Sequence, residues 1–276
     1  MRVVQTMLEA ARRLKGQWRM MIVLAAIYAA LLAALFFFVA TTEASAWQIL
    51  LTLCFAALAP ALFFLLQAML VNYARGETKA LLLLRRSFTD SCKLALASVP
   101  LALAVLLLLY LLNKLQPASH VWTAQATPPE MWPPPRLRAD ADANASLRWL
   151  FVAWTTLRFL LCYVALPLVA VHLWSAVARD GLLPAIKRAR HHLARAFAPE
   201  AVLTYAVGLL LFGLIPYALV FMRTPAASQA VEFGLFIARL ALVFVFTLYG
   251  WAVTFDALAR GGTANAAAVN DGAATS

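Results

Sequence analysis

The chain has 276 residues, of which 64% are hydrophobic and only 13% are charged. A mean hydropathy of +0.82 excludes an ordinary soluble domain, whose surface needs more polar residues than this chain contains. The net charge of +11 would suggest nucleic-acid binding in a soluble protein, but in so apolar a chain membrane topology explains it first. We therefore predict a membrane protein that binds no nucleic acid.

Six apolar runs are each long enough to cross about 30 Å of hydrocarbon. They predict an all-α fold, a polytopic bundle of six transmembrane helices that forms one domain over residues 1–260. In chain order the runs cover residues 20–42, 47–73, 94–112, 149–178, 200–222 and 229–257. Between the third and fourth runs lies a proline-rich outer loop, 113–148, and residues 261–276 are predicted to form a disordered cytoplasmic tail.

Most of the positive charge precedes the first, third and fifth spans, in residues 1–19, 74–93 and 179–199. Cytoplasmic loops of membrane proteins carry an excess of Lys and Arg. We therefore predict that both termini are cytoplasmic and that the membrane is the inner membrane of a bacterial cell.

The chain also carries a threefold repeat, with units at about 1–76, 77–181 and 182–262. Each even-numbered span ends in an Ala-Arg pair followed closely by Gly, as in "NYARGE", "SAVARDG" and "DALARGG". Each odd-numbered span is preceded by a basic pair: Arg12-Arg13, Arg85-Arg86 or His191-His192. We interpret the units as parallel helix-hairpin repeats that enter the membrane from the same face. Any six-span protein with basic inner loops would share part of this pattern.

Each unit is expected to begin with a basic amphipathic helix that lies in the cytoplasmic interface. In the stretch "RDGLLPAIKRARHHLARAF", Leu182, Ile186, Ala189, Leu193 and Phe197 recur at helical spacing and predict one apolar face. Cations on the other face would lie among lipid phosphates, so the expected partners are anionic membrane lipids, or a protein at the cytoplasmic helices. The basic residues of these helices are Arg12, Arg13, Arg85, Arg86, Lys187, Arg188, Arg190 and Arg195.

Two arginines within the spans are candidates for an anion- or lipid-binding site. Arg158 and Arg239 precede Arg179 and Arg260 by the same number of residues, which at 1.5 Å per residue is about one hydrocarbon thickness. This depth favours the outer headgroup region. If both arginines instead face a common axis, they would bind an anion, and Glu232, on the same helical face as Arg239, would neutralise part of their charge.

No catalytic, cofactor or metal-binding motif stands out in the sequence. The spans hold no paired carboxylates, and HExxH, GxSxG and P-loop motifs are absent. Cys54, Cys92 and Cys162 have no CxxC spacing, and His172 is interpreted as a structural hydrogen-bonding residue rather than a proton relay. We expect no enzymatic activity and no cofactor. A lipid-modifying enzyme would need a polar partner beside Cys162 or His172.

The stretch 158–197, with "RFLLCYVALP", a Gly-x-x-Pro-Ala turn and a following basic helix, and "LLLLRRSF" at 81–88 resemble a group of bacterial six-span membrane proteins. The group includes the membrane domain of some glycerophosphoryl diester phosphodiesterases and stand-alone relatives of unknown function. Arg158, Pro167, Gly181 and Pro184 carry the resemblance in the first of these stretches, and Arg85, Arg86, Ser87 and Phe88 carry it in the second. It implies the six-span fold but not the phosphodiesterase activity. In unit one, Cys54 occupies the position that corresponds to Arg158, so this unit departs from the pattern of the group.

The function expected from these features is that of a non-enzymatic integral membrane protein, a lipid-interacting or membrane-organising accessory. The alternative is a transporter or channel for a small or anionic solute, with Arg158 and Arg239 at its outer mouth. The alternative requires a polar, water-sized path between spans two, four and six, whereas dry packing of these spans on Leu, Phe and Ala favours the accessory function.

Overall fold

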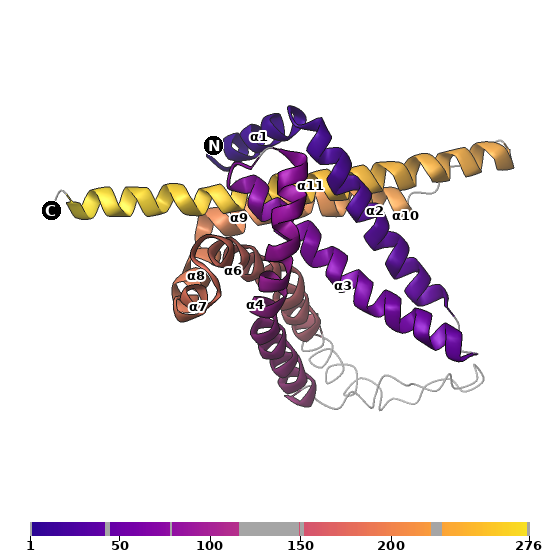
Figure 1. Cartoon of the computed structure of the whole chain (residues 1–276), viewed down its shortest axis with the longest axis horizontal. Coiled ribbons are helices and arrows are strands. Elements are labelled where there is room, and N and C mark those ends of the chain that lie inside the picture. Colours follow the sequence, from indigo (N-terminus) through magenta and orange to yellow (C-terminus); the bar gives the residue numbers. More distant parts are fainter. Residues whose placement is uncertain are drawn as a thin grey trace, which may run out of the picture. The chain divides into compact units, whose positions relative to one another are not determined.

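A computed structural model describes residues 2–41, 45–77, 79–115, 149, 152–221 and 228–274, with side chains for all except Arg2, Leu115 and 261–274. These residues are almost entirely helical and contain no strand, which confirms the predicted all-α class (Figure 1). The predicted proline-rich loop lies outside the described residues from 116 to 148. The predicted tail begins where side chains are no longer described, and its disorder stays a prediction.

Six helices are long and apolar enough to cross a membrane, as the hydropathy predicts. This is consistent with an integral, multi-pass membrane protein. They are α2 (Trp18–Ala40), α3 (Ala46–Ala74), α4 (Ala80–Leu115), a helix over Val152–Asp180 that contains η1 (Leu160–Ala165) and α6 (Leu166–Asp180), the run α9 (Pro199–Leu209), η2 (Leu210–Leu214) and α10 (Ile215–Phe221), and α11 (Gln229–Ala274).

The three basic segments differ from one another in structure. α1 (Arg2–Lys15) is a separate helix before α2, but the segment around Arg85 is continuous with the third span in α4. The third segment is two helices, α7 (Leu182–Lys187) and α8 (Ala189–Ala196), because the backbone at Arg188 leaves helical geometry. The expected basic helix is therefore separate from the span in unit one, continuous with the span in unit two, and divided into two short helices in unit three.

Glycine ends two of the even-numbered spans, as the Ala-Arg-Gly pattern predicts. Gly76 has φ 98° after α3, and Gly181 has φ 90° after α6. A residue with a Cβ is strained in this left-handed region, so glycine is the residue that terminates these helices most readily. The third such glycine, Gly261, lies within the bounds of α11.

The residues fall into two compact units, Met1–Val99 with Leu168–Ser276, and Pro100–Pro167. In the second unit, the Trp154 indole donates a hydrogen bond to the Leu112 carbonyl over 3.1 Å. Arg158 donates one to the Asn113 side chain. These two contacts hold the end of α4 beside the start of the fourth span.

The first unit holds most of the buried residues. α2 and α3 run side by side, with Leu31, Ala34 and Ala59 buried between them (Figure 1). α11 packs on α1, α3 and the α9–α10 run. The longest buried stretches are the last parts of the even-numbered spans, in 66–73, 168–177 and 252–258, whereas the rest of the spans exposes large apolar side chains.

Candidate functional site

Buried polar side chains gather where the even-numbered spans end. A buried polar or charged group costs free energy unless it finds a partner, and within membrane spans such groups are candidates for function. Asn72 in α3 and Asp256 in α11 are each 1% exposed, and each has polar partners from another helix or from the next turn.

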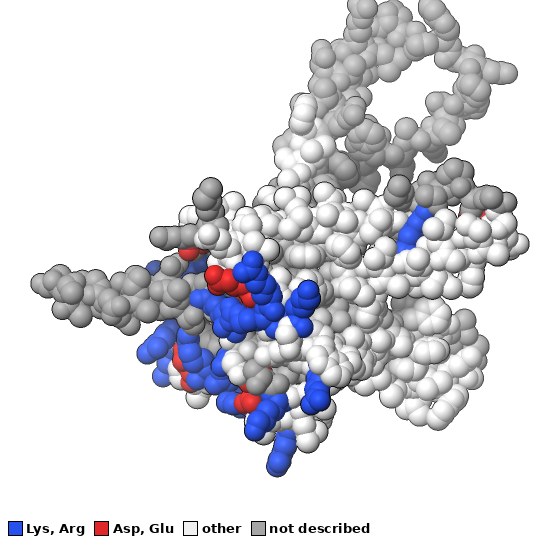
Figure 2. All heavy atoms as spheres, turned by 90° about the horizontal axis from the view of Figure 1, so that it is seen from above, with Lys and Arg blue, Asp and Glu red and all other residues white. Residues whose placement is uncertain are grey.

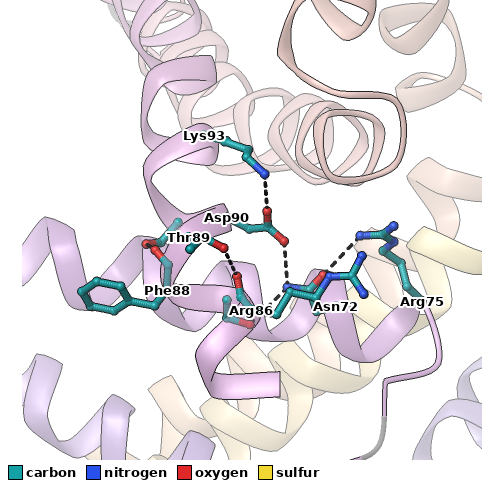
Figure 3. A network of polar contacts seen from close by, with 9 residues as sticks. Asn72, Arg75, Arg86, Phe88, Thr89, Asp90 and Lys93 are labelled. Carbon is teal, nitrogen blue, oxygen red and sulfur yellow. Dashed lines mark hydrogen bonds and ion pairs between the residues drawn. The ribbon is translucent and has the colours of Figure 1, made fainter. Parts of the chain in front are cut away.

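Asn72 connects the end of α3 to the beginning of α4 (Figure 3). Its amide donates to Ser87 Oγ and to Asp90 Oδ2, each over 3.2 Å. Its own carbonyl oxygen accepts from Arg75 Nη1 at 3.3 Å, and Lys93 Nζ lies 2.8 Å from Asp90 Oδ1. The Asp90 carboxylate is thus held between an amide and an ammonium group, with its charge neutralised locally.

The Arg-Ser-aromatic motif identified in the sequence lies at this junction. Ser87 is fully buried and reaches Asn72, whereas Phe88 is exposed and Arg86 lies 3.8 Å from Glu77 (Figure 3). The serine is therefore the residue of the motif that joins the two helices. No pattern in the sequence indicates a role for Asn72 or Asp90.

Asp256 forms the second cluster. Its Oδ1 accepts from Arg260 Nε over 2.7 Å, which is a contact between residues one turn apart. Its Oδ2 lies 3.8 Å from Arg13 Nη2 in α1. The aspartate therefore joins the first and last helices of the chain. Helical spacing alone predicts the Arg260 contact, but no sequence signal indicates the Arg13 contact.

The predicted arginine pair is divided between the two units. Arg158 is half-buried in the second unit, where it donates to Asn113, and Arg239 is half-buried on α11 in the first unit. Glu232 is exposed near the start of α11. A shared anion-binding site stays a prediction.

Most of the predicted interfacial cations are accessible. In the first unit, most of the Lys and Arg side chains gather on one side (Figure 2). Arg13 and Arg195 are half-buried. The remaining six are exposed: Arg12, Arg85, Arg86, Lys187, Arg188 and Arg190.

The buried face of α7 and α8 differs from the predicted apolar stripe. Ala185, His192 and Ala196 are buried, whereas Ile186 and Leu193 are exposed. Three of the five predicted stripe residues, Ile186, Leu193 and Phe197, are therefore exposed, and a histidine that belongs to a basic pair is buried. Hydrophobic periodicity identified the stripe but not which face packs on the protein.

His172 and the three cysteines have side chains that could take part in a reaction. His172 Nδ1 donates to the Leu168 carbonyl over 2.8 Å, one turn back in the same helix. The three cysteines are free thiols, with Cys162 half-buried and the other two exposed. Among the described residues, no group of three or more His, Cys, Asp and Glu side chains could hold a metal ion.

No family model, no curated protein and no solved structure matches the chain.

Proposed function

We propose that this chain is a non-enzymatic protein of the bacterial inner membrane, which binds anionic lipids and acts as a lipid-interacting or membrane-organising accessory. One observation carries the proposal: exposed cations lie beside exposed apolar side chains on the basic segments. On α7 and α8, Leu183, Ile186 and Leu193 are exposed together with Lys187 and Arg190. A helix with this surface is stable at the boundary between lipid headgroups and acyl chains, because its cations contact the headgroups and its apolar side chains contact the acyl chains.

The proposed bundle has three parallel repeats with both termini cytoplasmic. The ends of the even-numbered spans support this arrangement. The end of α3 contacts the basic beginning of α4 through Asn72 and Ser87. The end of α6 lines a pocket together with His192 of α8. The end of α11 contacts α1 through Asp256 and Arg13. The end of each even-numbered span thus lies near a basic segment of the chain, and the last of these contacts joins its first and last helices.

The resemblance to the bacterial six-span group agrees with this proposal, because it covers a membrane domain without the catalytic domain. Within the described residues, Ser87 of the resembling motif has a structural contact with Asn72 rather than a position near reactive groups. From the resemblance we infer only the fold and the location in the membrane, and no enzymatic activity.

Packing of the even-numbered spans favours the accessory function over a solute path. The buried stretches of α3, α6 and α11 are mostly apolar. Gln67, a polar exception, accepts a hydrogen bond from the Trp251 indole over 3.1 Å through its side-chain oxygen. Apolar packing along most of these stretches leaves little room for a hydrated ion.

Lipid retention by the purified protein tests the proposal. We expect Lys187→Gln/Arg188→Gln/Arg190→Gln to retain less phosphatidylglycerol, by roughly tenfold or more, because each surface cation contributes about 1 kcal/mol. Native mass spectrometry from nanodiscs of mixed phosphatidylglycerol and phosphatidylcholine gives the measurement. The matched variant Arg188→Lys/Arg190→Lys keeps the charge and should retain the lipid. Equal retention by all three proteins would remove the basis for the proposal.

A further inference from the structure

A small polar pocket lies where α6 ends, and neither the sequence motifs nor the lipid-facing cations account for it. Its volume is about 30 Å³. α6, α8 and α11 form its walls, and its polar lining consists of His172, Ser175, Arg179, His192 and Arg195. Leu258 and Ala259 of α11 supply apolar wall. All of these residues belong to the first unit.

Two polar atoms buried at this pocket have no hydrogen-bond partner among the described residues. They are Ser175 Oγ and His192 Nε2. His192 is 5% exposed, so water outside the protein does not solvate its ring. Burying an unsatisfied polar atom costs free energy, and native proteins rarely retain such atoms without a ligand, ion or ordered water.

The charges at this pocket differ from those in the other two clusters. In those clusters a carboxylate lies among the cations: Asp90 beside Lys93, and Asp256 between Arg260 and Arg13. Here Ser175 precedes Arg179 by one helical turn, as Asp256 precedes Arg260 in "DALAR". The pocket lining therefore has arginines and histidines but no acid. Asp180 contacts Arg179 Nε at 3.1 Å and is not part of the lining.

We infer that this pocket binds a phosphate-type oxyanion, which takes the place that the Asp256 carboxylate fills in the third unit. Ser175 Oγ and the guanidinium groups of Arg179 and Arg195 donate to its oxygens, and His192 Nε2 does so when the ring carries a proton there. A water-sized group needs about 10–15 Å³ of such volume, so the pocket admits two or three oxygens of a tetrahedral anion. The inference deepens the proposed lipid function, since a lipid headgroup and free phosphate offer the same chemistry.

The protonation of His192 is coupled to anion binding at this pocket. Burial lowers the pKa of His192 below its ordinary value, and the nearby His191, Arg195 and Arg179 lower it further, while Asp180 raises it. His172, which also lines the pocket, faces the same space. An anion in the pocket favours protonated His192, so anion affinity increases as the pH falls through the pKa that His192 has in the complex.

Sulfate is the probe for the first experiment because it keeps its charge between pH 5 and pH 8. The full-length protein is delipidated in a nonionic, phosphate-free detergent, and its melting temperature is titrated with sodium sulfate against sodium chloride at equal ionic strength. We expect sulfate to stabilise the wild type and to bind more tightly at pH 5.5 than at pH 7.5. No sulfate-specific stabilisation at either pH would overturn the inference.

Ser175→Asp is the decisive variant because it supplies the missing carboxylate from within. We expect this variant to weaken sulfate binding at least tenfold. Should it fail to fold, Arg195→Gln is measured instead, with the same expected loss. Arg19→Gln removes an exposed cation outside the pocket and should bind sulfate as the wild type does. A response in Ser175→Asp and Arg195→Gln equal to that of the wild type would also overturn the inference.

Binding of dioctanoyl phosphatidic acid distinguishes a lipid headgroup from free phosphate as the ligand. Dioctanoylglycerol, which lacks the phosphate, is the control. Tighter binding of the phosphatidic acid than of inorganic phosphate, lost in Ser175→Asp, assigns the pocket to a lipid headgroup. Equal binding assigns it to free phosphate. The pocket variants leave Lys187, Arg188 and Arg190 intact. The experiments therefore test the oxyanion pocket and the proposed lipid binding by the exposed cations independently of each other.

Discussion

Individual polar residues at the span ends are stabilised by partners that lie far away in the sequence. Asn72 donates hydrogen bonds to two residues of α4, and Asp256 forms an ion pair with Arg13 of α1. A carboxylate in an apolar environment stays charged only when cations or hydrogen-bond donors compensate for the lost water. These two clusters therefore lock helix ends together, and the pocket around His192 differs from them because its acid is missing.

Removing the Asp256 carboxylate should destabilise the protein. Asp256→Ala leaves Arg260 and Arg13 without their shared acceptor, but both arginines are partly exposed and regain water, so we expect a loss of about 1–3 kcal/mol. The free energy of unfolding in detergent micelles gives the measurement. Asp180→Ala breaks an exposed pair with Arg179 and should change stability by no more than about 0.5 kcal/mol. Equal losses in both variants would contradict this role of Asp256.

At the scale of helices, close approach depends on small residues. The α9–α10 run packs on α11, with Gly208 against Thr254 and Gly250 against Phe212. Small residues let membrane helices approach closely, where dispersion contacts replace the hydrophobic effect as the attractive force. The run also contains the π-helical segment η2 just before Pro216, which has no N–H to donate to the preceding turn.

A methyl group at Gly250 should separate these helices. The added Cβ would overlap the side chain of Phe212, and relieving that overlap should cost about 1–3 kcal/mol in Gly250→Ala. Gly234→Ala, on the same helix, has open space around the added carbon and should be neutral or up to about 1 kcal/mol stabilising. Thermal unfolding of the two variants in the same detergent tests this, and a neutral Gly250→Ala would show that the interface differs from the one described.

For the whole molecule, charge asymmetry predicts orientation. The segments 1–19, 74–93 and 179–199 carry most of the 23 Lys and Arg residues and lie at the same ends of alternating spans. We expect a C-terminal green fluorescent protein fusion to fluoresce in bacterial cells and a C-terminal alkaline phosphatase fusion to be inactive, because the charge asymmetry predicts that both termini face the cytoplasm. A fusion within 116–148 should give the opposite pair of results. Phosphatase activity of the C-terminal fusion would show that the C-terminus lies on the opposite side of the membrane from the one predicted.

The sequence by itself determined the class of the protein, the number of spans and the glycines that end α3 and α6. These are properties of one chain segment at a time, since hydropathy over about 20 residues and one backbone angle suffice to set them. It also located Arg260 beside Asp256, because a helical turn brings those two residues together.

Only the tertiary structure decided which faces meet. It joined Asp256 to Arg13, Asn72 to Asp90, and His192 to Ser175 around one pocket. It also made α4 continuous through Arg85 and divided the third basic segment at Arg188. The physical reason is that periodicity defines the apolar and polar faces of a helix, whereas the neighbour of each face is selected by packing among all the helices at once.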